Sequence, residues 1–336
     1  MLKNLSIVFA SPGEVELVKS ETEEIKDNEV LVEIAFSAIS SGTEKAKLSG
    51  ETNVAISAIP DPFPRRSGYS SSGTVIDTGK SVTSVKKGDR VALSWSVHSR
   101  YCILEEKNVH KIPSENIGLK EAALWHIASF PLAAIRKCRL ETGECAGVFG
   151  AGVLGIMAVK LLKASGAAPI FVCDPIEEKR KKALKAGADF AFDPFSSEYD
   201  KKIKEITGGG NVIIEVTGNG GGLNGALDCA ARFARIALLG CTRHSDFTVD
   251  YYKKVHGPGI TLVGAHTMAR PEHDSFSGWW TTADDMAAIG RLVMYNRLAF
   301  EDLIDEAHSP LEAKQVYSRL LSPEPFPVCV FDWSKI

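Results

Sequence analysis

Short apolar runs separated by turn residues fill the first third of the chain. Six of these runs have the length and β-branched content typical of strands, and dipeptides such as Pro12-Gly13, Thr78-Gly79 and Gly88-Asp89 separate them. The predicted strands cover residues 6–10, 15–18, 29–38, 73–78, 90–93 and 101–104. Short strands at this close spacing predict a β-barrel or a β-sandwich.

The pattern changes near residue 121, where apolar strands begin to alternate with helices of about three turns. Strands are predicted at 145–149, 169–173, 212–216, 235–239 and 260–265, and helices at 153–164, 177–186 and 223–233. Two more helices, at 283–295 and 311–321, precede a final strand at 328–332. The alternation predicts an α/β domain with a doubly wound parallel sheet.

The turn after the strand at 145–149 carries a glycine pattern with a chemical meaning. Gly150, Gly152 and Gly155 form G-x-G-x-x-G between a strand and a helix, which favours a dinucleotide-binding turn. Asp174 follows 19 residues after Gly155, at the end of the next strand, where a carboxylate accepts hydrogen bonds from a ribose. This carboxylate favours NAD over NADP, although Arg180 is near in sequence.

Composition excludes several classes of partner. The 336 residues are 44% hydrophobic, and this length favours two domains. A net charge of -3 gives no electrostatic reason to expect nucleic acid or a membrane surface as partner. The seven scattered cysteines contain no C-x-x-C pair, which is typical of a reducing compartment. The first apolar stretch is too short for a signal peptide, so a cytoplasmic protein is expected.

Several motifs, in order along nearly the whole chain, resemble the medium-chain dehydrogenase/reductase superfamily, of the zinc-type alcohol and polyol dehydrogenase kind. They are "GTVIDTG" (73–79), "KKGDRVAL" (86–93), "GAGVLG" (150–155), "EVTG" (215–218) and "ARIALLG" (234–240). The resemblance implies a GroES-like β-barrel catalytic domain, made from residues 1–125 and 267–336, and a Rossmann domain at 126–266. It also implies a homodimer or homotetramer. Within the superfamily, "SAISSGTE" and "VFDW" are most similar to the bacteriochlorophyllide-type branch.

The same resemblance assigns residues to the cofactor and to the former metal site. Besides the glycines and Asp174, it implies cofactor contacts from residues of the two nucleotide-domain turns and the helix after Asp174: Val153, Leu154, Arg180, Thr217 and Gly218. Ser41, Tyr69 and His126 stand where zinc-containing relatives have metal ligands. Only one of these three is a good zinc ligand, and the four-cysteine loop of a second, structural zinc is missing, so we expect no zinc.

Three residues are candidates for catalysis, each with a structural alternative. Thr43 stands where relatives pass a proton from the substrate, but it could equally be a helix N-cap. His126 could be a general base or a buried structural histidine. Tyr69 could donate to a substrate oxygen or only fill the space of the lost metal.

Four further residues are candidates for the substrate pocket: Ser41, Glu44, Trp95 and His98. Glu44 could instead be the acidic residue of a helix's first turn, and surface placement of Trp95 and His98 is an equal alternative.

The sequence therefore predicts an NAD-dependent oxidoreductase acting on a secondary alcohol or ketone, such as a polyol, sugar or hydroxylated ring compound. The alternatives are a quinone or enone reductase of the same superfamily and a catalytically silent NAD-binding regulator.

Overall fold

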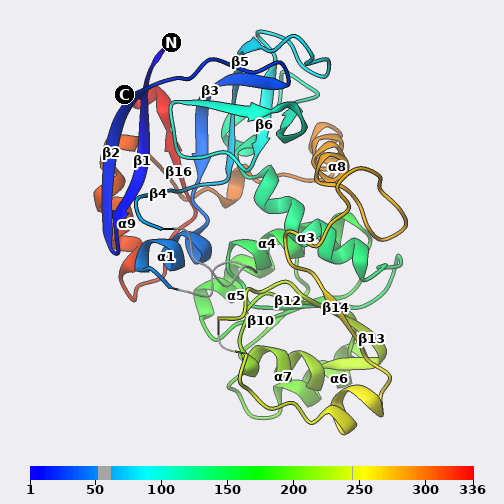
Figure 1. The fold of residues 1–336 in the computed structure, drawn as a ribbon. Coiled ribbons are helices and arrows are strands. Elements are labelled where there is room, and N and C mark those ends of the chain that lie inside the picture. Colours follow the sequence, from blue (N-terminus) through cyan, green and yellow to red (C-terminus); the bar gives the residue numbers. More distant parts are fainter. Residues whose placement is uncertain (52–61, 244) are drawn as a thin grey trace. The chain divides into compact units, whose positions relative to one another are not determined.

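The computed structural model describes residues 1–51, 62–243 and 245–336, which form two compact units (Figure 1). One unit combines Met1–Ile127 with Met286–Ile336, and the other is Ala128–Asp285. The first boundary is close to the one expected after residue 125, whereas the second lies beyond residue 266. Residues 267–285 belong with the second unit because Asp285 pairs there with Arg136 (2.8 Å) and Arg270 (3.1 Å).

The first unit contains two sheets whose strands are mostly antiparallel. One has the order β2-β1-β4, and the other has the order β15-β16-β3-β5-β6-β8 with β7 also paired to β3. The bounds are β1 Lys3–Ser11, β2 Glu14–Glu21, β3 Glu29–Ala38, β4 Arg65–Arg66, β5 Ser70–Thr78, β6 Arg90–Ser94, β7 Tyr101–Glu105, β8 Val109–Lys111, β15 Glu306–His308 and β16 Cys329–Asp332. All six strands predicted for the first third of the chain are confirmed.

Strand β3 is the centre of this unit. It pairs with β5, β7 and β16, and Val30, Val32 and Ile34 are buried in the hydrophobic core. Because β16 comes from the C-terminal segment, both ends of the chain build the same sheet (Figure 1). The helices of this unit, or entering it, are α1 Ser41–Ser49, α2 Leu119–Ala122, α3 Trp125–Lys137, α8 Thr282–Met294 and α9 Ala313–Leu321.

The second unit is a six-stranded parallel sheet of order β11-β10-β9-β12-β13-β14. Numbered within the unit this is 3-2-1-4-5-6, the order of a Rossmann fold. Figure 1 shows α4 and α5 on one side of the sheet and α6 and α7 on the other. The bounds are β9 Ala146–Phe149, α4 Val153–Ala164, β10 Ile170–Cys173, α5 Glu177–Ala186, β11 Phe190–Phe192, α6 Tyr199–Thr207, β12 Gly210–Glu215, α7 Gly220–Asp228, β13 Ala230–Leu238 and β14 Thr261–Gly264.

Most predicted elements of this unit are confirmed, and one is wrong. Helices α4 and α5 have the predicted bounds, and Gly187 ends α5 with φ 117°, as its sequence position suggested. The helix predicted at 223–233 instead spans 220–228, because residues from Ala230 onward enter β13 and pair with β12. In the first unit, the helix predicted at 311–321 is split into a 3-10 turn (Pro310–Glu312) and α9.

No helix in the described ranges is long and apolar enough to cross a bilayer. All seven cysteines are free thiols, and six of them are buried.

Candidate active site

The glycine-rich turn between β9 and α4 has the geometry of a dinucleotide cradle. Gly150 has φ 97°, a conformation that favours glycine. A side chain at Gly155 would place its Cβ 1.8 Å from the carbonyl oxygen of Gly150, so only glycine permits this packing of helix on strand. The space beside Gly152 is open, which leaves room for a ligand to approach the backbone. Val153 and Leu154 begin α4 here, and the N–H groups of a helix N-terminus favour an anion.

Asp174 follows directly after β10 and braces this turn. Its carboxylate accepts hydrogen bonds from the backbone N–H groups of Ala151 and Ile176, each at 2.8 Å, and the residue is only 4% exposed. The side chain of Arg180 reaches back from α5 and donates to the carbonyl oxygens of Asp174 (2.7 Å) and Pro175 (2.8 Å). The guanidinium of Arg180 therefore lies beside Asp174 at the carboxyl end of β10, although the residue itself belongs to α5.

A second turn of the same sheet follows β12. The buried Glu215 carboxylate accepts hydrogen bonds from the backbone N–H (2.7 Å) and the hydroxyl of Thr217, and from the N–H of Gly218 at 3.3 Å. Burial raises the pKa of Glu215, and these hydrogen bonds oppose that shift. Thr217 and Gly218 were predicted from sequence, whereas the role of Glu215 in holding their turn was missed.

In the first unit, three aromatic rings form a compact cluster. The rings of Tyr69 and His126 meet edge to face with centroids 5.9 Å apart, and Trp95 lies 4.7 Å from His126 and 6.0 Å from Tyr69. His126 is buried in the first turn of α3, and Trp95 is 39% exposed. The structure thus brings together three residues that sequence analysis selected from separate segments.

The hydroxyl of Tyr69 points to the start of α1. It donates a hydrogen bond to the Ser40 hydroxyl, and Ser40 is the N-cap residue of α1. Burial raises the pKa of Tyr69 to about 12 and the charge of Glu44 adds to this, while hydrogen bonding with Ser40 and Thr43 acts in the opposite direction. A phenol with this pKa stays neutral near pH 7 and remains a hydrogen-bond donor. Ser40 was not among the predicted site residues.

The start of α1 decides the structural alternatives for Thr43 and Glu44. Thr43 is the third residue of α1, so the alternative that it is the N-cap is wrong. Glu44 lies in the first turn of that helix, and its Oε1 accepts a hydrogen bond of 2.7 Å from the backbone N–H of Ser40. Ser41, the first helical residue, is partly buried beside them.

The pocket assignment of Glu44 and His98 needs correction, because both residues are 0% exposed. His98 Nε2 hydrogen-bonds Glu44 Oε2 at 3.1 Å, and the Tyr317 hydroxyl donates to the same oxygen at 2.5 Å. His98 Nδ1 hydrogen-bonds the Ser37 hydroxyl at 2.7 Å, which also accepts a hydrogen bond from the indole N–H of Trp333 at 2.9 Å. These residues form a buried polar network behind the start of α1, not a surface for substrate.

Comparison with known proteins identifies the family. A model of the alcohol dehydrogenase GroES-like domain matches residues 26–133, and a model of the zinc-binding dehydrogenase family matches residues 153–281. The chain belongs to the zinc-type medium-chain alcohol and polyol dehydrogenase superfamily of oxidoreductases.

Individual members of this superfamily resemble the chain to different extents. D-guloside 3-dehydrogenase of Escherichia coli K12 is 26% identical over 341 residues, which cover 95% of this chain and 96% of that protein. Quinone oxidoreductase-like protein 2 of Mus musculus is 32% identical over 186 residues, 53% of each chain. The crystal structure of galactitol-1-phosphate dehydrogenase from E. coli has a TM-score of 0.85 at 20% identity, covering 98% of this chain and 99% of that one.

The zinc that this superfamily name implies does not fit the residues at the start of α1. Zinc binds thiolate, imidazole and carboxylate ligands, whereas this position offers the Ser41 hydroxyl, the Tyr69 phenol and one imidazole, His126. The Tyr69 hydroxyl is also engaged with Ser40, and its raised pKa keeps it protonated. Glu44, the nearest carboxylate in sequence, is held in the buried network.

The dinucleotide that the superfamily name implies fits the chain well. The open backbone at Gly152, the N-terminus of α4 and the braced carboxylate of Asp174 supply the contacts that a pyrophosphate and a ribose require.

Proposed function

We propose that the chain is an NAD-dependent oxidoreductase that transfers a hydride between nicotinamide and a secondary alcohol or its ketone, without catalytic zinc. The observation that carries this proposal is the cluster of Tyr69, Ser40, Thr43 and His126 at the position of the family's metal site. This cluster replaces metal ligands with hydrogen-bond donors and with groups that can accept a proton.

In this proposal, NAD is held by the second unit. Gly150, Gly152 and Gly155 admit the pyrophosphate to the N-terminus of α4, and Thr217 with Gly218 lines the neighbouring turn. The Asp174 carboxylate retains lone pairs for the ribose hydroxyls, because among the described residues each oxygen accepts a single backbone hydrogen bond. Its negative charge disfavours the 2′-phosphate of NADP. When bound, the nicotinamide accepts or supplies the hydride.

The protein's own groups handle the proton and the substrate oxygen. The Tyr69 phenol is neutral, with a pKa of about 12, and has one proton, which it donates to Ser40 in the free chain. A bound substrate oxygen would take over this hydrogen bond from Ser40 and be polarised by it. During alcohol oxidation, the hydroxyl proton passes through the Thr43 hydroxyl to the imidazole of His126; during ketone reduction, it returns by the same route. Until substrate binds, Ser40 accepts the hydrogen bond from Tyr69 and holds the phenol at the start of α1.

The substrate class we favour is a polyol, a sugar derivative or a hydroxylated ring compound. The support comes from D-guloside 3-dehydrogenase, which matches nearly the whole chain, because the oxidation of a secondary hydroxyl is the reaction that its name describes. The match to quinone oxidoreductase-like protein 2 covers about half of the chain and motivates quinone reduction as the second candidate.

The deciding experiment supplies the purified protein with NAD or NADH and three groups of compounds: polyols and sugars, hydroxylated ring compounds, and quinones. NADH absorbance is followed in both directions. Turnover of a hydroxyl or ketone compound, retained after dialysis against a chelator, supports the proposal. Turnover of quinones alone supports the second candidate, and NADH binding without any turnover supports a catalytically silent regulator.

A further inference from the structure

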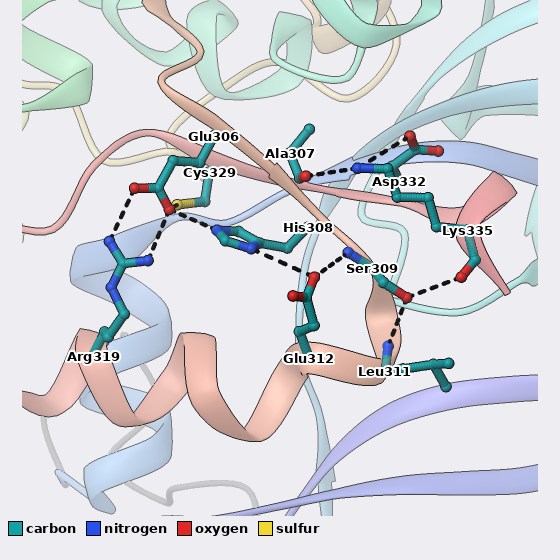
Figure 2. Close-up of polar contacts among 10 residues, drawn as sticks. All are labelled: Glu306, Ala307, His308, Ser309, Leu311, Glu312, Arg319, Cys329, Asp332 and Lys335. Atoms are coloured by element: carbon teal, nitrogen blue, oxygen red, sulfur yellow. Dashed lines mark hydrogen bonds and ion pairs between the residues drawn. The ribbon is translucent and has the colours of Figure 1, made fainter.

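A second cluster of reactive side chains lies on the two C-terminal strands of the first unit. Strands β15 and β16 run parallel, with Glu306 opposite Cys329, and His308 follows two residues after Glu306 on the same face of β15 (Figure 2). These elements are different from those that hold Tyr69, Ser40 and Thr43. The proposed hydride transfer makes no use of this cluster.

The three side chains converge closely. His308 Nε2 lies 2.6 Å from Glu306 Oε2, and Cys329 Sγ lies 3.8 Å from the same oxygen. One ligand atom from each residue lies within 4.8 Å of the other two. Cys329 is fully buried, whereas Glu306 and His308 are partly exposed, so the thiol forms the floor of the cluster and the other two groups its accessible side.

We propose that Glu306, His308 and Cys329 form a binding site for Zn²⁺ or a similar thiophilic divalent cation. Imidazole, thiolate and carboxylate are the three ligand types that zinc combines in proteins, with water as the usual fourth ligand of an open site. The cation takes the place of the proton between His308 Nε2 and Glu306 Oε2, and Cys329 Sγ binds it as a thiolate. The thiol releases its proton, the N–H of the neutral imidazole moves from Nε2 to Nδ1, and no electron is transferred.

The neighbours of these residues are arranged as supports for such a site. Glu312 Oε2 lies 3.6 Å from Nδ1 of His308, on the ring nitrogen that a metal would leave free. A ligating histidine usually directs its other N–H to a carboxylate, which fixes the ring and raises its basicity. Arg319 donates to both oxygens of Glu306, at 2.8 and 3.0 Å, and orients that carboxylate (Figure 2).

The contact with Arg319 is compatible with metal binding. Glu306 Oε2 is contacted by Arg319, by His308 Nε2 and by the Cys329 thiol. The cation takes the place of the protons from His308 and Cys329, so the arginine contact stays intact. In a zinc site with bonds of about 2.0–2.3 Å, the ligand atoms lie closer together than the 4.8 Å that limits their separation here. Glu306 and His308 are partly exposed, so their side chains have room to move toward the cation.

A bound cation would connect β15 to β16 and reinforce the C-terminal closure of the sheet. The backbone also connects this place to the candidate active site, because the carbonyl of Cys329 accepts a hydrogen bond of 3.0 Å from the N–H of Ile39, next to Ser40. Because the cation would hold β15 against β16, we assign it a structural role. We expect it to raise the thermal stability of the chain without being required for hydride transfer.

Titration of the metal-free full-length protein with Co²⁺ tests the proposal, because thiolate coordination gives cobalt a strong charge-transfer absorption. We expect this absorption to saturate at one cobalt per chain and to disappear on addition of Zn²⁺. The test variants are Cys329→Ser and His308→Gln. The matched controls are Cys241→Ser, at the exposed cysteine, and His273→Gln, at an exposed histidine.

We expect the charge-transfer absorption to be lost in Cys329→Ser and cobalt affinity to fall at least tenfold in His308→Gln, with both controls unchanged. Zn²⁺ should also raise the melting temperature of the parent and the controls but not of Cys329→Ser. His308→Gln keeps the test decisive if Cys329→Ser does not fold. The proposal is wrong if the parent shows no saturable absorption, or if His308→Gln binds cobalt like the parent.

Discussion

Tyr69 directs its phenol to Ser40 and contacts the ring of His126, so Tyr69→Phe removes one donor and little volume. We expect turnover to fall by about 10²-fold, the scale on which loss of one preorganised donor acts. Because the pKa of Tyr69 is about 12, the ratio of parent to variant turnover should stay constant from pH 7 to pH 10. Tyr295→Phe, at an exposed tyrosine, is the matched control. A ratio that changes across this range would mean that the phenol ionises during the reaction.

Thr43 and His126 are the residues to which we assign the proton. Thr43→Val and His126→Ala should each lower turnover by about 10²-fold or more, the usual scale of general acid–base catalysis. Binding of NADH should change little, because the contacts proposed for the dinucleotide lie in the second unit. Steady-state kinetics and NADH fluorescence titration measure the two effects separately. Full activity in both variants would make these residues structural.

Asp174 combines a negative charge with a bracing role in the glycine turn. We expect the parent to bind NADH more tightly than NADPH, because the carboxylate repels a 2′-phosphate. Asp174→Asn should reduce this preference by removing the charge while keeping an oxygen for the N–H of Ala151. Fluorescence titration with both reduced cofactors measures the preference, and Glu178→Gln, at an exposed acid of α5, is the control. Tighter binding of NADPH by the parent would show that Arg180 dominates this site.

Sequence reasoning found residues whose role follows from local context. The glycine pattern and Asp174 have fixed spacing from a strand and a helix, so their placement could be predicted. Ser40 was missed because its partner, Tyr69, comes from another segment. Tyr317 and Trp333 were missed for the same reason, since they are 273 and 296 residues away from Glu44 and Ser37, their respective partners.

At the scale of elements, the buried network around Glu44 joins α1 to β3, α9 and the C-terminal turn. Tyr317→Phe removes the donor to Glu44 Oε2 and leaves the buried carboxylate with one hydrogen bond fewer. Glu44 Oε2 keeps its hydrogen bond with His98, so we expect the free energy of unfolding to fall by about 1.5–3 kcal/mol, the contribution of one hydrogen bond to a charged group. Urea unfolding measures this, with Tyr252→Phe, at an exposed tyrosine, as control. Equal stability of the two variants would contradict a stabilising role for the network.

Element boundaries could be predicted where local signals were strong. Gly187 marks the end of α5, and the strands of the first unit are separated by turn residues. The helix predicted at 223–233 failed because the apolar residues after Asp228 also suit a strand, and pairing with β12 decides between the two. A helix at the position of α1 was only one alternative for Thr43 and Glu44, because the sequence does not show that its N-cap is Ser40 or that Glu44 accepts from the N–H of Ser40.

For the molecule as a whole, two sequence patterns predicted the two kinds of unit. Closely spaced strands predicted the antiparallel unit, and alternating strands and helices predicted the parallel sheet. The parallel sheet was recognisable because each βα step is local, and its strand order agrees with a doubly wound fold. The pairing of β16 with β3 joins segments about 290 residues apart, and only the family resemblance could supply it before the structure was known. The second unit boundary depends on contacts that the sequence does not show, such as the Asp285 ion pairs with Arg136 and Arg270.

The open edge of the parallel sheet is a candidate surface for self-association. Within the described ranges, strand β14 pairs with β13 on one side and with no strand on the other, and Leu262 on it is 40% exposed. The unpaired N–H and C=O groups of an edge strand pair readily with a second copy of the same strand. We expect light scattering at micromolar concentration to give two or four times the 36.3 kDa mass of one chain.

A charge on this edge should prevent such pairing, since a symmetric contact would bring two like charges together. Leu262→Lys should therefore shift the light-scattering mass toward one chain while circular dichroism stays unchanged. Val18→Lys is the matched control, because Val18 is 39% exposed on β2, an edge strand of the three-stranded sheet. A parent protein with the mass of a single chain would refute self-association. Loss of the oligomer in Val18→Lys but not in Leu262→Lys would place the interface on the antiparallel unit instead.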